Sequence, residues 1–148
     1  MSEKKAAPQI TPELSANDHE VVRQQHREER TEDYVEAIFR LQKGEEDIRV
    51  VDLQDVFGVS HVTVIRTLDR LEKEGFIERG KRGIALLDKG QRLAIACYQR
   101  HQTVESFLLA LGVPEEAARR DAEGIEHHLG EESLKAMNRY LEKRENSP

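Results

Sequence analysis

The chain has 148 residues and a mass of 17.0 kDa, which suits one domain or two small domains that share a core. Charged residues make up 35% and hydrophobic residues 37%, a balance that excludes fibrous proteins, and no apolar run approaches the roughly 20 residues that cross a bilayer. The N-terminus lacks an apolar signal-peptide core, and the single Cys97 excludes a disulfide framework or a zinc site of several thiolates, so we expect a cytoplasmic protein with no membrane partner.

The charge is unevenly distributed along the chain. The net charge of −6 argues against a non-specific coat on nucleic acid. Residues 60–90, however, carry seven basic and five acidic groups, whereas residues 121–145 carry four basic and seven acidic groups. This pattern indicates an anionic partner for the first segment and a cationic partner for the second.

The first 18 residues hold two of the four prolines and few large apolar groups, so we expect a flexible N-terminal arm over residues 1–18. A helix follows, capped by Asn17 or Asp18, and it continues through residues 31–41, where apolar side chains recur at helical spacing. Gly44 and its acidic neighbours end this pattern.

Residues 50–57 predict a short helix, and Gly58 follows it at the position that favours a positive φ. Ser60 is a good N-cap for a second helix over residues 61–74, and Gly75 ends that helix. Two short helices joined through a glycine turn are typical of a helix-turn-helix.

Two short apolar runs then flank the basic sequence Gly80-Lys81-Arg82-Gly83, which predicts a β-hairpin wing. We therefore expect residues 19–90 to form a winged helix-turn-helix domain that binds DNA. The candidate DNA-contacting residues are Ser60, His61, Val62, Thr63, Arg66, Thr67, Arg70, Lys81 and Arg82. Base edges are expected to meet His61, Val62, Thr63 and Arg66, and phosphates are expected to meet Thr67, Arg70, Lys81 and Arg82.

Residues 88–111 predict a long helix, a second helix opens at Pro114 and reaches His128, and a last amphipathic helix covers residues 131–144. These helices carry more aliphatic surface than the small winged domain can cover. The expected fold is mainly α, with a helical dimerisation and metal-binding domain over residues 91–148 and a homodimeric assembly.

Glu123, Glu126 and His127 stand at i, i+3 and i+4, which places them on one helix face. The two carboxylates repel each other when they converge, so this arrangement is unfavourable unless a cation binds between them. Carboxylate-rich sets with one or two imidazoles suit manganese(II) or iron(II), whereas zinc sites favour thiolate and imidazole. The alternative for this triplet is a solvated acidic face.

His101 lies on the apolar stripe of the long helix, where a core histidine is the alternative to a ligand. Asp33 and Glu36 form a second carboxylate pair at i and i+3, with an ordinary surface pair as the alternative. Together the candidates amount to four carboxylates and two histidines on three helices, enough for one metal ion or a carboxylate-bridged pair.

These motifs occur in a fixed order: TEDYVE at residues 31–36, the winged helix-turn-helix, Arg100-His101, and DAEGIEHH at residues 121–128. Over about residues 30–145 the chain resembles the diphtheria-toxin-repressor family of metalloregulators, in its manganese-transport-regulator branch. The resemblance implies a binuclear manganese(II) site in each subunit with the ligands Asp33, Glu36, His101, Glu123, Glu126 and His127. The iron-sensing branch has Met and Cys at the positions of Asp33 and Glu123.

From these observations we predict a manganese-responsive repressor of metal-uptake genes that binds double-stranded operator DNA as a homodimer when metal is bound. Two regulators remain as alternatives, an iron(II)-responsive member of the same family and a metal-independent winged-helix protein. A ferritin-like di-metal enzyme would require paired Glu-x-x-His motifs, which the chain does not contain, so we expect no enzymatic activity.

Overall fold

The computed structural model describes residues 16–44 and 47–146, and within them the chain is mainly helical with one small hairpin. The elements are α1 (Ala16–Leu41), α2 (Val50–Phe57), α3 (His61–Lys73), β1 (Ile77–Gly80), β2 (Gly83–Leu86), α4 (Asp88–Ala110), α5 (Glu115–Ile125), the 3-10 turn η1 (Glu126–His128) and α6 (Glu131–Glu145). The predicted fold class is confirmed. None of the described helices combines the length and the apolar character that crossing a membrane requires.

α2 and α3 form the predicted helix-turn-helix, and both predicted caps are present. Gly58 adopts a left-handed conformation with φ of 62°, and its N–H donates to the carbonyl of Gln54 at 2.8 Å. The Ser60 hydroxyl accepts a hydrogen bond from the backbone N–H of Thr63 at 3.2 Å. These caps satisfy backbone groups that the helix ends would otherwise leave unpaired.

β1 and β2 pair antiparallel, with Ile77 opposite Leu86, and they form the predicted wing. The wing is fixed to the segment before α2, because the N–H of Ile84 donates to the carbonyl of Ile48 at 2.9 Å. Gly83 lies against the same carbonyl with φ of 80°, and a Cβ there would approach the Ile48 oxygen to 2.3 Å. The tip residues between the strands remain exposed to solvent.

α1 is longer than the core that it covers, so only its second half is packed. Tyr34, Val35 and Ile38 are buried in the core, and the Tyr34 ring stacks on Phe57 of α2 at 4.3 Å between centroids. Residues 17–28 are exposed along their whole length. Residues 1–15 of the predicted arm lie outside the described residues, and residues 16–18 are helical, so the helix begins earlier than predicted.

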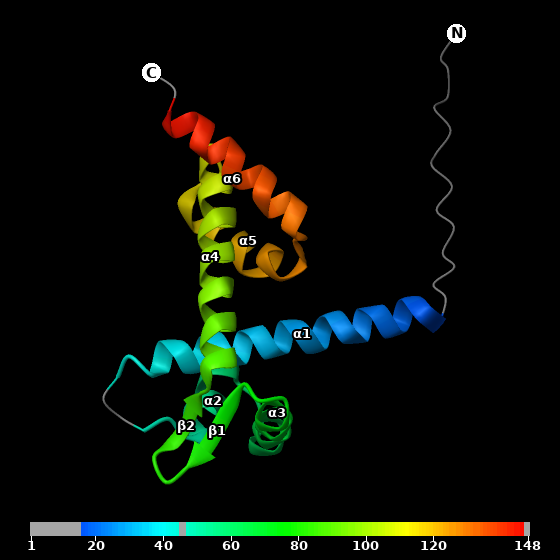
Figure 1. The fold of residues 1–148 in the computed structure, drawn as a ribbon, viewed down its shortest axis with the longest axis vertical. Helices are drawn as coiled ribbons and strands as arrows, with labels where there is room; N and C mark the ends of the chain where they lie inside the picture. The colour runs from blue at the N-terminus through cyan, green and yellow to red at the C-terminus, as the bar shows by residue number, and fades with distance from the viewer. Residues whose placement is uncertain (1–15, 45–46, 147–148) are drawn as a thin grey trace.

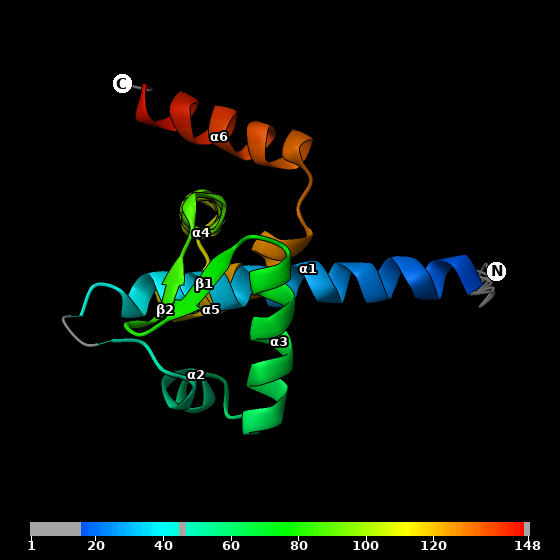
Figure 2. The ribbon, with the colours of Figure 1, turned by 60° about the horizontal axis from the view of Figure 1, so that its bottom comes forward.

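α4 connects the two ends of the molecule: its start lies on the hairpin, and its later turns pack against α5 and α6 (Figures 1 and 2). The predicted boundary at residue 90 falls inside this helix. Gly90 is the point of close approach, since a Cβ there would lie 2.2 Å from the carbonyl oxygen of Phe76. The same helix therefore belongs to the core of the winged unit and to the C-terminal region.

Gly90→Ala is expected to lower the free energy of unfolding by about 1–3 kcal/mol, because the added methyl group pushes α4 away from the hairpin. Gly124→Ala in α5 is the matched control: nothing lies within 4 Å of its added Cβ, and alanine improves helix propensity by up to ~1 kcal/mol. Denaturant unfolding of the metal-free protein measures both, and equal stability of the two variants would contradict this packing.

Candidate metal centre

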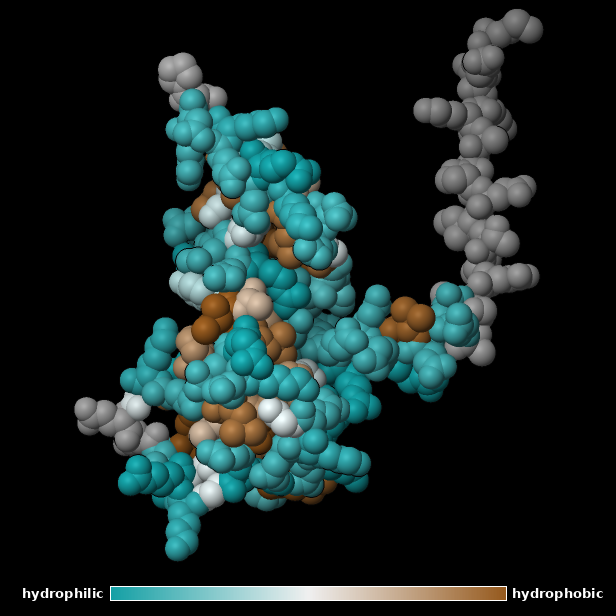
Figure 3. Space-filling view, viewed as in Figure 1, coloured by the Kyte–Doolittle hydropathy of each residue, from teal (hydrophilic) through white to brown (hydrophobic). Residues whose placement is uncertain are grey.

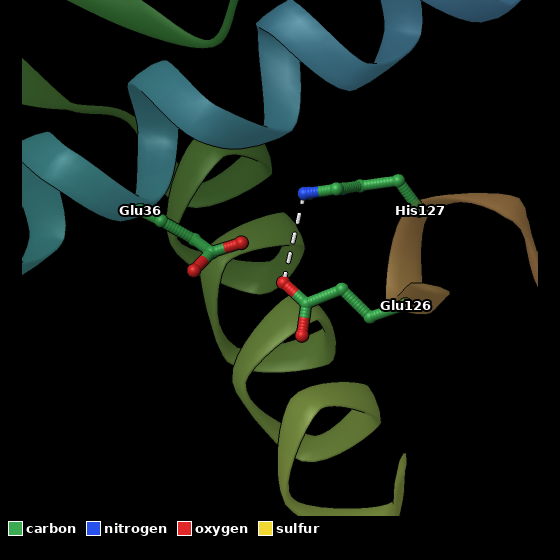
Figure 4. A group of neighbouring side chains, drawn as sticks. All are labelled: Glu36, Glu126 and His127. Atoms are coloured by element: carbon green, nitrogen blue, oxygen red, sulfur yellow. Dashed lines mark ion pairs between the residues drawn. The ribbon is translucent and has the colours of Figure 1, made fainter. Parts of the chain in front are cut away.

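Charged side chains from α1, α4 and the turn η1 converge where these three elements meet. Figure 4 shows Glu36 reaching from α1 toward Glu126 and His127, which come from η1. The Glu126 side chain is 0% exposed, and Glu36 is also buried. Buried carboxylates need compensation by hydrogen bonds, protons or cations, so this cluster is the strongest candidate for a functional site in the described part of the chain.

The first group of donor atoms comprises Glu36, Glu126 and His127. One ligand atom from each lies within 4.8 Å of the others, and His127 Nε2 lies 3.7 Å from Glu126 Oε1. Glu36 Oε1 and both oxygens of Glu126 are buried without a hydrogen-bond partner. This geometry leaves several lone pairs directed into one small volume.

The second group comprises His101 of α4, Glu123 of α5 and the same Glu126. His101 Nδ1 lies 2.9 Å from Glu126 Oε2 and 3.9 Å from Glu123 Oε1. The angle at the shorter contact does not make a hydrogen bond, so the nitrogen is also without a partner. Glu126 thus has one oxygen near each group, in the position of a carboxylate that two sites share.

Asp33 stands beside these groups, with Oδ1 3.2 Å from His127 Nε2. The structure therefore brings all six predicted ligand candidates into one region. They differ in burial: Glu126 is fully enclosed, whereas the side chain of Glu123 is 51% exposed. The cluster is therefore closed to solvent at Glu126 and open to solvent at Glu123.

A divalent cation fits the residues present. Burial raises the pKa of Glu36, and burial together with the charge of Glu36 raises the pKa of Glu126 to about 7. The shifts show that burial outweighs the positive charge nearby, from Arg40 beside Glu36 and from the histidines beside Glu126. Unpartnered carboxylate oxygens with imidazole nitrogens are the donor set that manganese(II) and iron(II) accept.

The C-terminal end of α5 differs from the sequence-based prediction. The α-helix that was expected to reach His128 ends at Ile125, and residues 126–128 form a 3-10 turn. Such a turn has three residues per turn instead of 3.6, so it changes the angular spacing of successive side chains. Glu126 still has helical φ/ψ, and its N–H donates to the carbonyl of Ala122, so Glu123 and Glu126 belong to one donor group and the spacing changes only beyond Glu126. The two differ in burial, since Glu126 is enclosed while Glu123 is half-exposed.

Sequence reasoning missed Glu32, which lies behind His127. Glu32 Oε2 is 2.6 Å from His127 Nδ1, and Arg100 Nη2 is 2.7 Å from Glu32 Oε1. Arg100 also donates to the sulfur of the buried Cys97 at 3.2 Å. A hydrogen bond at Nδ1 fixes the imidazole with Nε2 toward the other candidates. No spacing rule reveals a pair separated by 95 residues.

Glu105 and Arg40 were also not predicted. Glu105 Oε2 lies 3.3 Å from His101 Nε2, and its i+4 position on α4 was an available signal. Arg40 Nη2 lies 3.2 Å from Glu36 Oε2 and 3.9 Å from Glu123 Oε1. The Arg40 guanidinium offsets part of the repulsion between the carboxylates, whereas Glu105 adds negative charge beside His101.

The candidate DNA-contacting residues divide into two sets in the structure. The exposed set is Ser60, His61, Val62, Thr63, Arg66, Lys81 and Arg82. Thr67 lies on the core side of α3, where its hydroxyl donates to the carbonyl of Thr63 at 3.0 Å, so the expected phosphate contact is not available. Arg70 is occupied as well: it donates to Thr31 Oγ1 at 2.8 Å and pairs with Glu74 at 3.2 Å.

A winged helix-turn-helix that shares a helix with a carboxylate and histidine cluster defines a metal-dependent regulator of transcription. Residues 27–84 match the family model of the N-terminal DNA-binding domain of the iron dependent repressors, and residues 87–148 match the model of their metal-binding and dimerisation domain. The chain belongs to this family, in the branch whose members are called MntR.

Curated relatives agree with this placement. The transcriptional regulator MntR of Escherichia coli O157:H7 is 43% identical over 141 residues, which cover 95% of this chain and 91% of the relative. The HTH-type transcriptional regulator MntR of Bacillus subtilis (strain 168) is 36% identical over 104 residues, covering 70% of this chain and 73% of that protein. The relatives are regulators of transcription rather than enzymes.

Solved structures share the fold. A manganese-dependent transcriptional repressor in complex with manganese superposes with a TM-score of 0.67 at 26% identity, covering 75% of this chain and 52% of that chain. The manganese regulator SloR gives the same TM-score and identity, with coverages of 76% and 53%. This chain spans about half the length of those structures.

Glu32→Gln is expected to weaken manganese(II) binding by about 10- to 100-fold, because it removes the charge that holds Nδ1 of His127 and turns Nε2 toward the cluster. Glu28→Gln, one turn earlier on the exposed surface of α1, makes the same charge change without touching the site. Calorimetric titration measures both affinities. Equal losses in the two variants would show a general charge effect and not positioning.

Manganese affinity is expected to rise with pH between pH 6 and 8. Hydrogen bonds to Asp33 and Glu32 raise the pKa of His127 to about 10, and the pKa of Glu126 is raised to about 7, so the metal-free protein holds protons that ligation displaces. The dissociation constant should fall about tenfold per pH unit above pH 7, where His127 holds the displaced proton, and more steeply below pH 7, where Glu126 is protonated as well. Titration in buffers of different ionisation enthalpy counts released protons, and a value of zero would contradict this mechanism.

Proposed function

We propose that this chain is a manganese-responsive transcriptional repressor that binds operator DNA as a homodimer and represses genes for metal uptake. The observation that carries the proposal is the position of the carboxylate and histidine cluster, which joins α1 of the winged unit to α4 and η1. The MntR names of the relatives and the manganese complex of the related repressor support manganese as the metal.

The cluster can control DNA binding because its residues come both from the winged unit and from the C-terminal elements. Glu36 and Asp33 belong to α1, whose neighbouring side chains form the core under α2 and α3. Glu126 and His127 belong to the turn after α5. A bound divalent cation supplies the positive charge that allows these carboxylates to lie together. The residues then hold α1 and the winged unit in one fixed relation to the C-terminal helices.

Two ions per subunit are the proposed stoichiometry. The support is the pair of donor groups, one containing Glu36 and His127 and the other containing His101 and Glu123, with Glu126 common to both. A carboxylate between two cations neutralises part of their mutual repulsion. Among the first-row ions, manganese(II) has the lowest affinity for nitrogen and sulfur ligands and is suited by oxygen ligands. Carboxylate oxygens at Asp33 and Glu123 therefore favour manganese(II) over iron(II).

The proposed DNA interface consists of the exposed start of α3 and the tip of the wing. His61, Val62 and Arg66 present donor, apolar and cationic groups that suit base edges in the major groove. Lys81 and Arg82 at the tip suit phosphates. Thr67 and Arg70 are left out of this interface, because both are engaged within the protein.

The proposed homodimer uses the C-terminal helices. Large apolar side chains remain exposed on or next to α4, α5 and α6, among them Ile95, Tyr98, Leu111 and Ile125. Figure 3 shows apolar patches that reach the surface over the middle of the molecule, beside α4. Apolar surface of this kind is covered in a stable assembly, and residues 87–148 match a model described as a dimerisation domain.

The decisive experiment measures operator binding by chelator-stripped protein with a panel of divalent metals under anaerobic conditions. The histidine variants His101→Ala and His128→Ala form the comparison. The His101 side chain is 12% exposed with Nδ1 at Glu126, whereas the His128 side chain is 51% exposed and lies 3.6 Å from Glu29, outside the cluster.

His101→Ala is expected to require at least ~100-fold more manganese for half-maximal operator binding, because a ligand is lost, whereas His128→Ala should stay within about threefold of wild type. A His101→Ala protein that melts earlier but responds normally would identify a core histidine. Wild-type binding that is equal in manganese and in chelator would favour the metal-independent regulator.

A further inference from the structure

The N-terminal half of α1 is a free-standing helix beside the recognition helix α3. Residues 17–28 and Arg30 are exposed, and packing begins at Thr31. Figures 1 and 2 both show α1 crossing α3 and continuing beyond it, on the side away from α2 and the hairpin. This segment extends about 20 Å at 1.5 Å per residue. The packed second half of α1 holds this segment in position, and the exposed surface of the segment is accessible to a partner.

The basic residues of this segment are arranged on one face. His19, Arg23, His26 and Arg30 fall at i, i+4, i+7 and i+11, within an arc of about 60° when successive residues turn by 100°. We call these four residues the basic stripe. None of them forms a hydrogen bond or an ion pair with another described residue. Random placement would have scattered these groups around the helix.

The acidic residues of the same segment lie elsewhere on the helix or are engaged. Glu28 lies on the opposite side of the helix from the stripe and accepts a hydrogen bond from Gln24 at 2.7 Å, whereas Glu20 flanks the stripe on one side and Asp18 flanks it on the other. Glu29, at the near flank, lies 3.6 Å from His128. Arg27, between the stripe and the core, pairs with Glu74, the C-cap residue of α3, and this pair fixes this part of α1 against the end of the recognition helix.

The basic stripe ends next to the residues that would meet DNA. His26 and Arg30 line a surface hollow together with Val59 and Thr63, at the start of the recognition helix. Asp33 lines the same hollow, but it is turned toward His127. A duplex seated against the exposed face of α3 would run alongside the free half of α1. Two unpaired arginines and two exposed imidazoles on one face, beside a groove-reading helix, complement the phosphate backbone.

We propose that the basic stripe binds backbone phosphates that flank the bases met by α3. The proposal rests on the proposed function, because it assumes that the chain binds DNA. Its contacts would be independent of base sequence, since phosphates carry no sequence information directly. The stripe would therefore raise affinity and fix the register of the protein on the duplex, while α3 and the wing supply discrimination.

The test compares Arg23→Gln/Arg30→Gln with Lys135→Gln/Arg139→Gln. The second pair removes the same charge from exposed positions on α6, at the opposite end of the molecule from α3 (Figure 1). Affinity for operator and for non-operator DNA is measured against salt concentration with saturating manganese. Circular dichroism confirms equal helix content, and sedimentation confirms an equal oligomeric state.

The stripe variant is expected to bind both DNAs at least about tenfold more weakly at low salt, with an unchanged ratio between them. Its slope of log affinity against log salt should be shallower by about 2 to 4, since a dimer carries two stripes and each lost phosphate contact removes about one unit. The α6 variant should keep the wild-type slope.

Three results would overturn the proposal: an unchanged salt slope, a loss confined to operator DNA, which indicates base reading, or a changed oligomeric state, which indicates contact between copies. The slope on non-operator DNA needs no metal response. This slope therefore tests the stripe even if the wild-type protein binds the operator equally in manganese and in chelator. That result would contradict the proposed function but not the role of the stripe.

Discussion

The carboxyl group of Glu126 is the constraint around which the rest of this structure is arranged. It is fully enclosed where α1, α4 and η1 meet, and neither of its oxygens accepts a hydrogen bond. Burying an ionised carboxylate without a partner costs several kcal/mol, so the group either holds a proton or receives a cation. The raised pKa of Glu126 corresponds to the protonated state. The imidazoles of His101 and His127 on either side make the second state chemically available.

This constraint connects the two ends of the molecule because the helices around Glu126 also build the DNA-binding unit. α1 contributes Glu36 to the cluster and, one turn or less away, Val35 and Ile38 to the core beneath the helix-turn-helix. α4 contributes His101 and, near its start, the glycine that packs against Phe76. Packed helices are close to rigid bodies, so a change in the spacing of α1 and η1 is carried to α3 and the wing. The coupling follows from shared elements and requires no separate relay of residues.

Much of this organisation could be predicted from the sequence, since it depends on local signals. Gly58, Ser60 and the basic tip of the hairpin mark their structures directly, and the i, i+3 and i+4 spacing indicated which acidic residues to consider. Contacts between distant segments were beyond such rules. The pairing of Glu32 with His127 spans 95 residues, and the burial of Thr67 depends on which side of α3 faces α1. The 3-10 turn that begins at Glu126 also carries no clear sequence signal.

The burial of Cys97 has a consequence for the redox chemistry of the protein. Its sulfur lies inside α4's packed face, one turn from His101, and burial raises the pKa of the thiol to about 12. Oxidants, alkylating agents and soft metals all react with the thiolate, which is almost unpopulated at neutral pH under these conditions. Burial and the raised pKa therefore protect the sole sulfhydryl of the chain from reaction, despite its closeness to the cluster. The donor atoms that the cluster offers to a metal are oxygen and nitrogen.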